Sequence, residues 1–331
     1  IVDRMYIGRI PDHATLSLTG LGLSMPIISA VIAFANLFGV GGAPLCSIAR
    51  GKGDIKGAEK VVGNAFTMLL CTGVLLTVMG LLFKKPLLYA FGASDATFPF
   101  ADSYLSIYLL GCTFVTVSLG MNSYINAQGF ARMGMVTTLI GAVLNIILDP
   151  LFIFTMGMGI RGAAIATVIS QLASAIWTVR FLTSPKAILR IRVSCMRPCL
   201  KTIRDIAALG LSNFMMSITN SIVQVVCNST LSLYGGDLYV GVMTVINSVR
   251  EIVSMPVSGI TNGSQPVISF NYGAEKYDRI KTAIRFMAVS CIAYTTAIWG
   301  ILHLFPVFFI HIFNTQADLV EAAVPSMQIY Y

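Results

Sequence analysis

The residue with the most evident chemistry is Asp149, a carboxylic acid inside an otherwise apolar run from Met133 to Ile160. An ionised carboxylate at bilayer depth costs several kcal/mol on most estimates, so such an acid is expected to face a cavity or a partner. Asn145 lies four residues earlier, on the same face of a helix. Pro150 follows directly, removes a backbone donor and tends to free a carbonyl one turn back. These groups predict a site for a cation or a shared proton; the structural alternative is a clamp between helices.

Neutral polar residues recur at helical spacing in three further segments. In the first half, Ser118, Asn122 and Asn126 follow each other every four residues and are expected to face an aqueous cavity. The second half carries two longer stripes, namely Asn213, Ser217, Asn220, Gln224 and Asn228, and then Asn247, Glu251, Ser254, Ser258, Thr261 and Gln265. Glu251 would then lie on an inward face as a second proton carrier. Ordinary hydrogen bonding between membrane helices is the alternative for both stripes.

The elements that carry these residues are expected to be membrane-spanning helices. The chain has 331 residues, 56% hydrophobic and only 11% charged, with a mean hydropathy of +0.80. Soluble proteins average about 25% charged residues, and a spanning helix needs about 20 predominantly apolar ones. We expect eight full spans between two partial ones, so both termini look truncated, and no signal peptide is visible at Ile1. The spans are 14–49, 61–83, 103–131, 133–160, 162–179, 206–236, 238–274 and 286–317.

The net charge of +8 belongs to the short connections between spans. Taken alternately, one set of connections holds 16 Lys and Arg residues and the other set holds five. Because Lys and Arg accumulate in cytoplasmic loops, the first set is predicted to be cytoplasmic in a multi-pass cell-membrane protein. This distribution explains the positive net charge of the chain without a nucleic-acid partner.

An internal repeat divides the chain into two similar lobes. The segment from Pro44 to Gly51 resembles the segment from Pro266 to Gly273, at an offset of 222 residues, and each closes an apolar span before a charged loop. Six spans separate the copies, so the copies are expected to be parallel, with a ligand in the cleft between lobes. The alternative to a repeat is that Pro and Gly commonly occur where a span ends. The predicted division is 1–183 for the first lobe, 184–203 for a basic inter-lobe loop and 204–331 for an incomplete second lobe.

Cofactor chemistry has little support in the sequence. Cys195 and Cys199 share the basic loop, but no His is near them, so reduced thiols are expected rather than a metal site. The string from Arg50 to Gly53 lacks the spacing of a phosphate-binding loop, so ATP is not implied. Apart from H+ or Na+ as a coupling ion, no cofactor is predicted.

Three motifs together resemble the multidrug and toxic compound extrusion (MATE) family, in particular its prokaryotic DinF-like branch within the MOP superfamily. They are Gly42-Ala-Pro44 with Gly51-Lys-Gly-Asp54, then Leu144-Asn-Ile-Ile-Leu-Asp-Pro-Leu-Phe-Ile153 with Gly162-Ala-Ala-Ile-Ala-Thr167, and Gly263-Ser-Gln-Pro-Val-Ile-Ser-Phe-Asn-Tyr-Gly-Ala274. The resemblance implies an all-α polytopic membrane protein with two pseudo-symmetric six-helix lobes. It also implies a cation or proton site made by Asn145, Asp149, Asp3, Thr167 and Tyr104, and a drug cavity near Asn122.

The resulting expectation is an antiporter that exports amphipathic organic compounds against H+ or Na+ by alternating access. We expect Asn122, Asn126, Asn220, Gln224 and Glu251 to line its substrate cavity. Its partners would be small-molecule drugs or toxic metabolites and the lipid bilayer, and we expect a monomer. A lipid-linked oligosaccharide flippase is the nearest alternative, but only Arg250 lies within a span to meet a pyrophosphate. An intramembrane enzyme would need a convergent set such as a DDxxD or HExxH string, and neither occurs. A purely structural or channel-forming protein is a third alternative, which is distinguished by whether flux into vesicles saturates and follows an imposed pH or sodium gradient.

Overall fold

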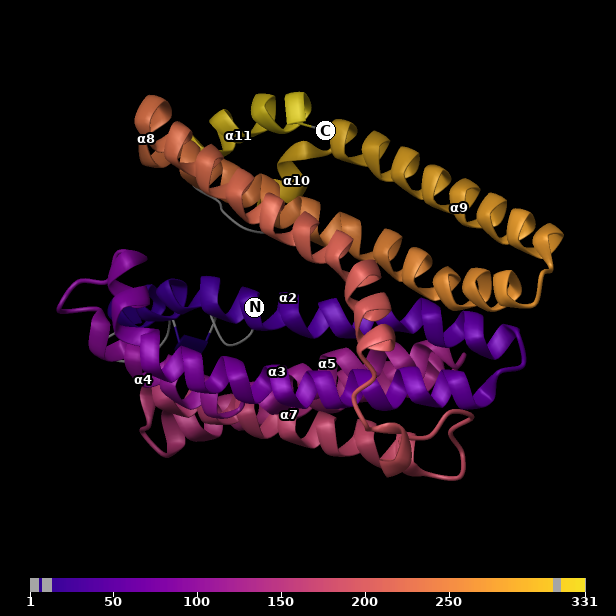
Figure 1. The fold of residues 1–331 in the computed structure, drawn as a ribbon. Helices are drawn as coiled ribbons and strands as arrows, with labels where there is room; N and C mark the ends of the chain where they lie inside the picture. Colours follow the sequence, from indigo (N-terminus) through magenta and orange to yellow (C-terminus); the bar gives the residue numbers. More distant parts are fainter. Residues whose placement is uncertain (1–5, 8–13, 312–316, 331) are drawn as a thin grey trace. The chain divides into compact units, whose positions relative to one another are not determined.

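The computed structural model describes residues 6–7, 14–311 and 317–330, and within them every regular element is helical. The all-α prediction is therefore confirmed (Figure 1). The helices are α2 (Ala14–Gly51), α3 (Ile55–Ala90), α4 (Phe98–Leu110), α5 (Cys112–Ala127), α6 (Ala131–Pro150), α7 (Gly159–Thr183), α8 (Leu200–Gly273), α9 (Tyr277–Leu304), α10 (Pro306–His311) and α11 (Ala317–Tyr330), with a π-helical turn at Leu151–Thr155 and a 3-10 turn at Val193–Cys195.

Most of these helices have the length and composition of membrane spans. Among the described residues, five are long and apolar enough, and the bent pair of α4 and α5 is a sixth candidate. Five of these six coincide with predicted spans, and two other predicted spans fall on α8. The predicted span 286–317 is matched only in part, because α9 ends at Leu304 and α10 begins at Pro306. Many large apolar side chains point outward, for example Leu82 and Ile176. A helix that is apolar all round is expected in lipid, where only internally hydrogen-bonded backbone is tolerated.

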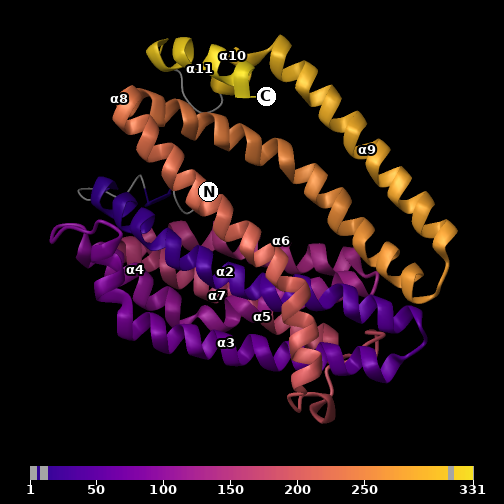
Figure 2. The same cartoon turned by 45° about the horizontal axis from the view of Figure 1, so that its top comes forward.

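The chain forms two compact units, Ile1–Phe214 and Met215–Tyr331. In the first unit, α2 lies along both α3 and α5 (Figures 1 and 2). Gly39 of α2 and Gly120 of α5 make a close backbone contact, since a Cβ built on Gly39 would lie 2.7 Å from the Cα of Gly120. Small residues of this kind let membrane helices pack backbone against backbone.

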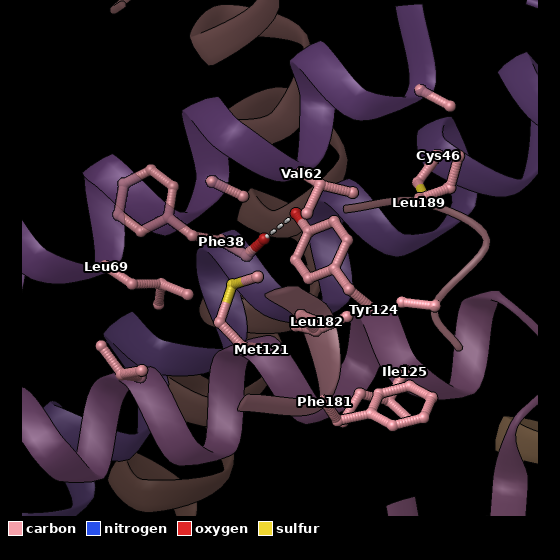
Figure 3. Packing of buried hydrophobic residues seen from close by; sticks show 14 of the residues in the cluster. Phe38, Cys46, Val62, Leu69, Met121, Tyr124, Ile125, Phe181, Leu182 and Leu189 are labelled. Carbon is pink, nitrogen blue, oxygen red and sulfur yellow. Dashed lines mark hydrogen bonds between the residues drawn. The ribbon is translucent and has the colours of Figure 1, made fainter. Parts of the chain in front are cut away.

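A core of buried side chains fills the part of the first unit where α2, α3, α5 and α7 meet (Figure 3). Its centre is Tyr124 of α5, which is fully buried among Phe38, Val62 and Met121. The Tyr124 hydroxyl donates a hydrogen bond of 2.7 Å to the carbonyl oxygen of Phe38. The phenol thus joins α5 to α2 with its polar atom satisfied, as a buried tyrosine requires.

The segment between α7 and α8 packs onto the first unit. Ala187 and Leu189 belong to the same buried core, and Leu189 is fully buried. We call the end of the first unit that contains this segment and the turns 52–54 and 128–130 the basic end, and the opposite end, with the turns 91–97 and 156–158, the pocket end. The predicted lobe limits at 183 and 203 remain predictions. The boundary between the two compact units lies after Phe214.

In the second unit, the later part of α8 packs with α9, α10 and α11. Figure 2 shows α8 reversing direction near its middle, so that its later arm runs back beside α9. Val245, Leu302, Ile310 and Met327 contribute to one buried cluster from these four helices. The Tyr294 hydroxyl of α9 donates to the carbonyl of Val253 of α8 at 3.2 Å.

The predicted internal repeat reappears in backbone geometry. The turn after α2 places Gly53 at a φ of +80°, and the turn after α8 places Glu275 at +57°, exactly 222 residues later. Hydrogen bonds also correspond, since Asp54 N–H donates to Ala49 O at 3.0 Å and Lys276 N–H donates to Asn271 O at 2.9 Å. Both helices therefore end in the same left-handed turn, which glycine adopts more easily than glutamate.

Candidate functional site

Asp149 lies one residue before the end of α6 and is fully buried. The Asn145 side-chain amide donates to Asp149 Oδ1 at 3.2 Å. The same amide nitrogen lies 3.4 Å from the hydroxyl oxygen of Thr167 on α7. The structure therefore brings Asn145, Asp149 and Thr167 together from two helices, as one polar cluster inside an apolar segment.

The backbone next to this cluster is not regular α-helix. Pro150 has no N–H, and a five-residue π-helical turn, Leu151–Thr155, follows it. The N–H of Met156 donates to Leu151 O at 2.9 Å, which is the five-residue spacing of a π turn. Such turns occur mostly as short bulges and often at functional sites, because they redirect side chains and carbonyls.

Gly162 holds α7 against this turn. A Cβ built on Gly162 would lie 2.7 Å from the backbone carbon of Phe152, so only glycine fits at this contact. Thr167 stands five residues further along α7 and reaches the Asn145 amide from there. The close approach of the two backbones thus holds α7 beside the segment that follows Asp149.

The chemistry available to the cluster is that of oxygen ligands and one titratable acid. A carboxylate, an amide and a hydroxyl supply the hard oxygen atoms that alkali and alkaline-earth cations prefer. The Asn145 amide can present either its nitrogen or its oxygen to the same neighbours after a rotation of 180°. Its NH2 group stabilises an ionised Asp149, whereas its oxygen would face a protonated carboxyl group or a bound cation.

Of the other two residues predicted for the cation site, the structure describes one, Tyr104. Asp3 is outside the described residues. Tyr104 is 3% exposed on α4 and stacks with Tyr108, with 6.2 Å between ring centroids. Both rings belong to a buried cluster that includes Ile153 of the π turn, so Tyr104 lies in the packing that covers this turn. Its role in ion binding stays a prediction.

The residues predicted for the substrate cavity are distributed over both units. Asn122 and Asn126 of α5 point toward α6 at Gly134, where an added Cβ would lie 3.2 Å from Asn122 Oδ1 and would also meet Asn126 Oδ1. Asn220 and Glu251 have exposed side chains on α8. The side chain of Gln224 is outside the described residues. Their common role in a cavity stays a prediction.

Sequence reasoning missed a second polar network, at the basic end. Asn64 of α3 accepts from the N–H of Cys199 at 2.7 Å and donates to Cys195 O at 3.3 Å. Glu59 pairs with Arg192, with a distance of 3.0 Å from Nε to Oε2. The signal in the sequence is that Asn64 and Thr67 lie just inside an apolar span. Their partners lie more than 100 residues away, so the sequence alone does not identify them.

The chain matches the MatE family model over residues 1–151 and 213–331. It is 25% identical over 326 residues to the multidrug export protein MepA of Staphylococcus aureus (strain MSSA476), which covers 98% of this chain and 71% of that protein. MepA of Staphylococcus saprophyticus is 24% identical over 335 residues, covering 100% and 71%.

Solved structures show the same fold. A MATE structure in the bent conformation superposes with a TM-score of 0.92 at 24% identity, over 99% of this chain and 72% of that one. A MOP superfamily transporter from Pyrococcus furiosus gives a TM-score of 0.91 at 23% identity, over 99% and 73%.

Proposed function

Because this chain belongs to the MatE family, we propose that it is a secondary active transporter that exports amphipathic organic compounds in exchange for H+ or Na+. The observation that carries the proposal is the buried cluster of Asn145, Asp149 and Thr167. The relatives named multidrug export protein support the same substrate class.

The first step is the binding of the coupling ion by Asp149. A carboxyl group inside a membrane span is expensive to keep ionised, so it gains from taking up a proton or a cation. Asn145 lies within hydrogen-bond reach of both Asp149 and Thr167, and these two neutral side chains complete the site with donors and oxygen atoms. When Asp149 loses its negative charge, its carboxyl group is better partnered by the oxygen of the Asn145 amide than by the nitrogen.

The second step transmits this change to the packing of the first unit. Asn145 contacts both α6 and α7, and the π turn after Pro150 packs on α7 through Gly162. An ion that binds one arrangement of these helices more tightly than another shifts the balance between the two arrangements. If the substrate also distinguishes the arrangements, the ion and the substrate are thermodynamically coupled.

The orientation follows from the distribution of basic residues. The basic end carries Arg50, Lys52, Lys186, Arg190 and Arg192, whereas the turns of the pocket end are poor in Lys and Arg. Since positively charged loops remain in the cytoplasm, we assign the basic end to the cytoplasmic side and the pocket end to the outside. The coupling ion then enters from the side of the pocket end.

The test is transport of ethidium by the purified protein in lipid vesicles, with a pH gradient and a sodium gradient imposed separately. The variant Asp149→Asn keeps the size of the side chain but removes its charge and its proton site. We expect gradient-driven ethidium transport to fall to the level of empty vesicles. The gradient that drives the unchanged protein identifies the coupling ion.

A matched control is Asp95→Asn, which removes an exposed aspartate that accepts from the Tyr89 hydroxyl near the surface. We expect this variant to transport at the normal rate. If Asp149→Asn protein inserts normally and still transports ethidium at the full rate under either gradient, the assigned ion site is wrong.

A further inference from the structure

A cavity of about 640 Å³ opens at the pocket end of the first unit. This volume is within the range of sites for small molecules, about 300–1,000 Å³. Its walls come from the beginnings of α2, α4 and α7 and from the π turn, and they include Ser17, Phe100, Ser103, Phe154 and Arg161. Phe100, Phe154 and their apolar neighbours form most of the wall. The polar side chains in it are those of Ser17, Ser103 and Arg161.

The only charged side chain among the residues that line the cavity is Arg161. Its Nε–H donates to the Ser103 hydroxyl at 3.4 Å, and no carboxylate among the described residues forms an ion pair with it. The neighbouring Asp102 is bound instead by Lys84, with 2.6 Å between Nζ and Oδ1. The cavity therefore has a positive charge that the described part of the protein does not neutralise.

Helix geometry adds to this positive potential. Helices α2, α4 and α7 all begin at the cavity, with 38, 13 and 25 residues. The N-terminal residues of α4 and α7 have no side-chain cap. The first turn of a helix carries unpaired N–H groups and a partial positive charge, both of which favour an anion.

A buried hydroxyl supplies an independent observation. Ser17 of α2 is only 1% exposed, and it lines the cavity. Buried polar groups are nearly always paired, so a buried hydroxyl that lines a cavity can also bind a ligand atom or water there.

We propose that this cavity binds an amphipathic organic anion, with its carboxylate or phosphate at Arg161 and Ser103 and its apolar part against Phe100 and Phe154. The charge is opposite to that of an organic cation, so this ligand is distinct from such an exported substrate. The site is also separate from the Asp149 cluster, although Phe154 belongs to the π turn that follows Asp149. A free carboxylate from solution and an anionic lipid of the outer leaflet share this chemistry.

The first arm of the experiment measures binding of decanoate to the delipidated protein in a neutral detergent by isothermal titration calorimetry. Decyltrimethylammonium, with the same chain length and the opposite charge, is the ligand control. We expect decanoate to bind and Arg161→Gln to weaken it by about tenfold or more, since a charge-assisted hydrogen bond is lost. Arg161→Lys should recover part of the affinity. Arg132→Gln, which removes an exposed arginine at the basic end, should leave it unchanged.

The second arm measures lipid retention by native mass spectrometry after exchange into nanodiscs of phosphatidylglycerol or phosphatidylcholine. Selective retention of phosphatidylglycerol that Arg161→Gln abolishes identifies the lipid as the source, whereas decanoate binding alone identifies a free carboxylate. Equal binding of the two decyl compounds, or no dependence on Arg161 in either arm, would overturn the proposal. Both arms measure binding rather than transport, so their outcome is independent of whether Asp149 couples export to an ion.

Discussion

The two ends of the first unit differ in how their polar side chains are partnered. At the basic end, the segment 184–199 is held by side chains of α3 and of the turn after α5. Gln128 is 2% exposed and accepts from Leu189 N–H at 2.9 Å, while the hydroxyl of Thr67 donates to Met196 O at 2.9 Å. At the pocket end, Lys84 and Asp102 form an ion pair, but around the cavity Arg161 reaches Ser103 only at 3.4 Å and the Ser17 hydroxyl lines the wall.

Two buried acids show the same contrast within the unit. Glu59 is 5% exposed and forms an ion pair with Arg192, so its charge is compensated by the protein itself. Asp149 is fully buried and receives the neutral amide of Asn145. A buried acid with a fixed cation is a structural element, whereas we propose that Asp149, which accepts from the Asn145 amide, exchanges a proton or a cation.

The largest loss of stability is expected at Asn64, which is fully buried. Asn64→Ala removes the acceptor for the Cys199 N–H and the donor to Cys195 O. We expect the free energy of unfolding to fall by about 2 kcal/mol, because two part-buried backbone groups lose their partners. Denaturation in detergent micelles measures the change, and hydrogen exchange should become faster at residues 195–199. The exposed Asn262→Ala is the matched control; equal stability of the two variants would mean that the segment is not held by Asn64.

An intermediate effect is expected at Cys199, which precedes the first residue of α8. Hydrogen bonds from Thr202, first from its backbone, and then from the Lys60 ammonium group lower the pKa of the Cys199 thiol to about 7. Because a lowered pKa favours the thiolate, alkylation of Cys199 should reach half its maximal rate near pH 7 and slow below it. The rate is measured from the labelled peptide by mass spectrometry.

The Lys60→Gln variant should move this midpoint to higher pH and slow alkylation at pH 7 a few-fold. Lys56→Gln, on the same face of the membrane and exposed, is its control. A midpoint that stays near the ordinary pKa of cysteine, about 8.5, in the unchanged protein would show that the segment does not hold Cys199 beside Lys60.

The smallest effect is predicted at the pocket end. Ser103→Ala removes a long hydrogen bond to an exposed arginine, so the free energy of unfolding should change by less than about 0.5 kcal/mol. The same denaturation experiment measures it beside Asn64→Ala. A loss of about 2 kcal/mol here would erase the contrast, because the pocket end would then be stabilised by its polar contacts as the basic end is.

Much of the fold was predictable because it depends on local composition. Uninterrupted apolar runs locate spans such as 61–83, since lipid forces the backbone to bond within each helix. The repeat at Pro44 and Pro266 was likewise readable, and the matching turns at Gly53 and Glu275 agree with it. The position of Asp149 four residues after Asn145 predicted their contact, because helical spacing places both on one face.

The partners of these residues were decided by tertiary structure. Nothing in the order of residues relates Asn64 to Cys199, or Arg192 to Glu59, because these contacts depend on how the segment 184–199 folds back onto α3. The same is true of the cavity at Arg161, which exists only where three helices begin side by side. Local sequence therefore determined which segments are helices and which acid lies within the membrane, since both follow from short-range hydrogen bonding and solvation. Packing between distant helices determined which polar groups are satisfied and which remain for a ligand.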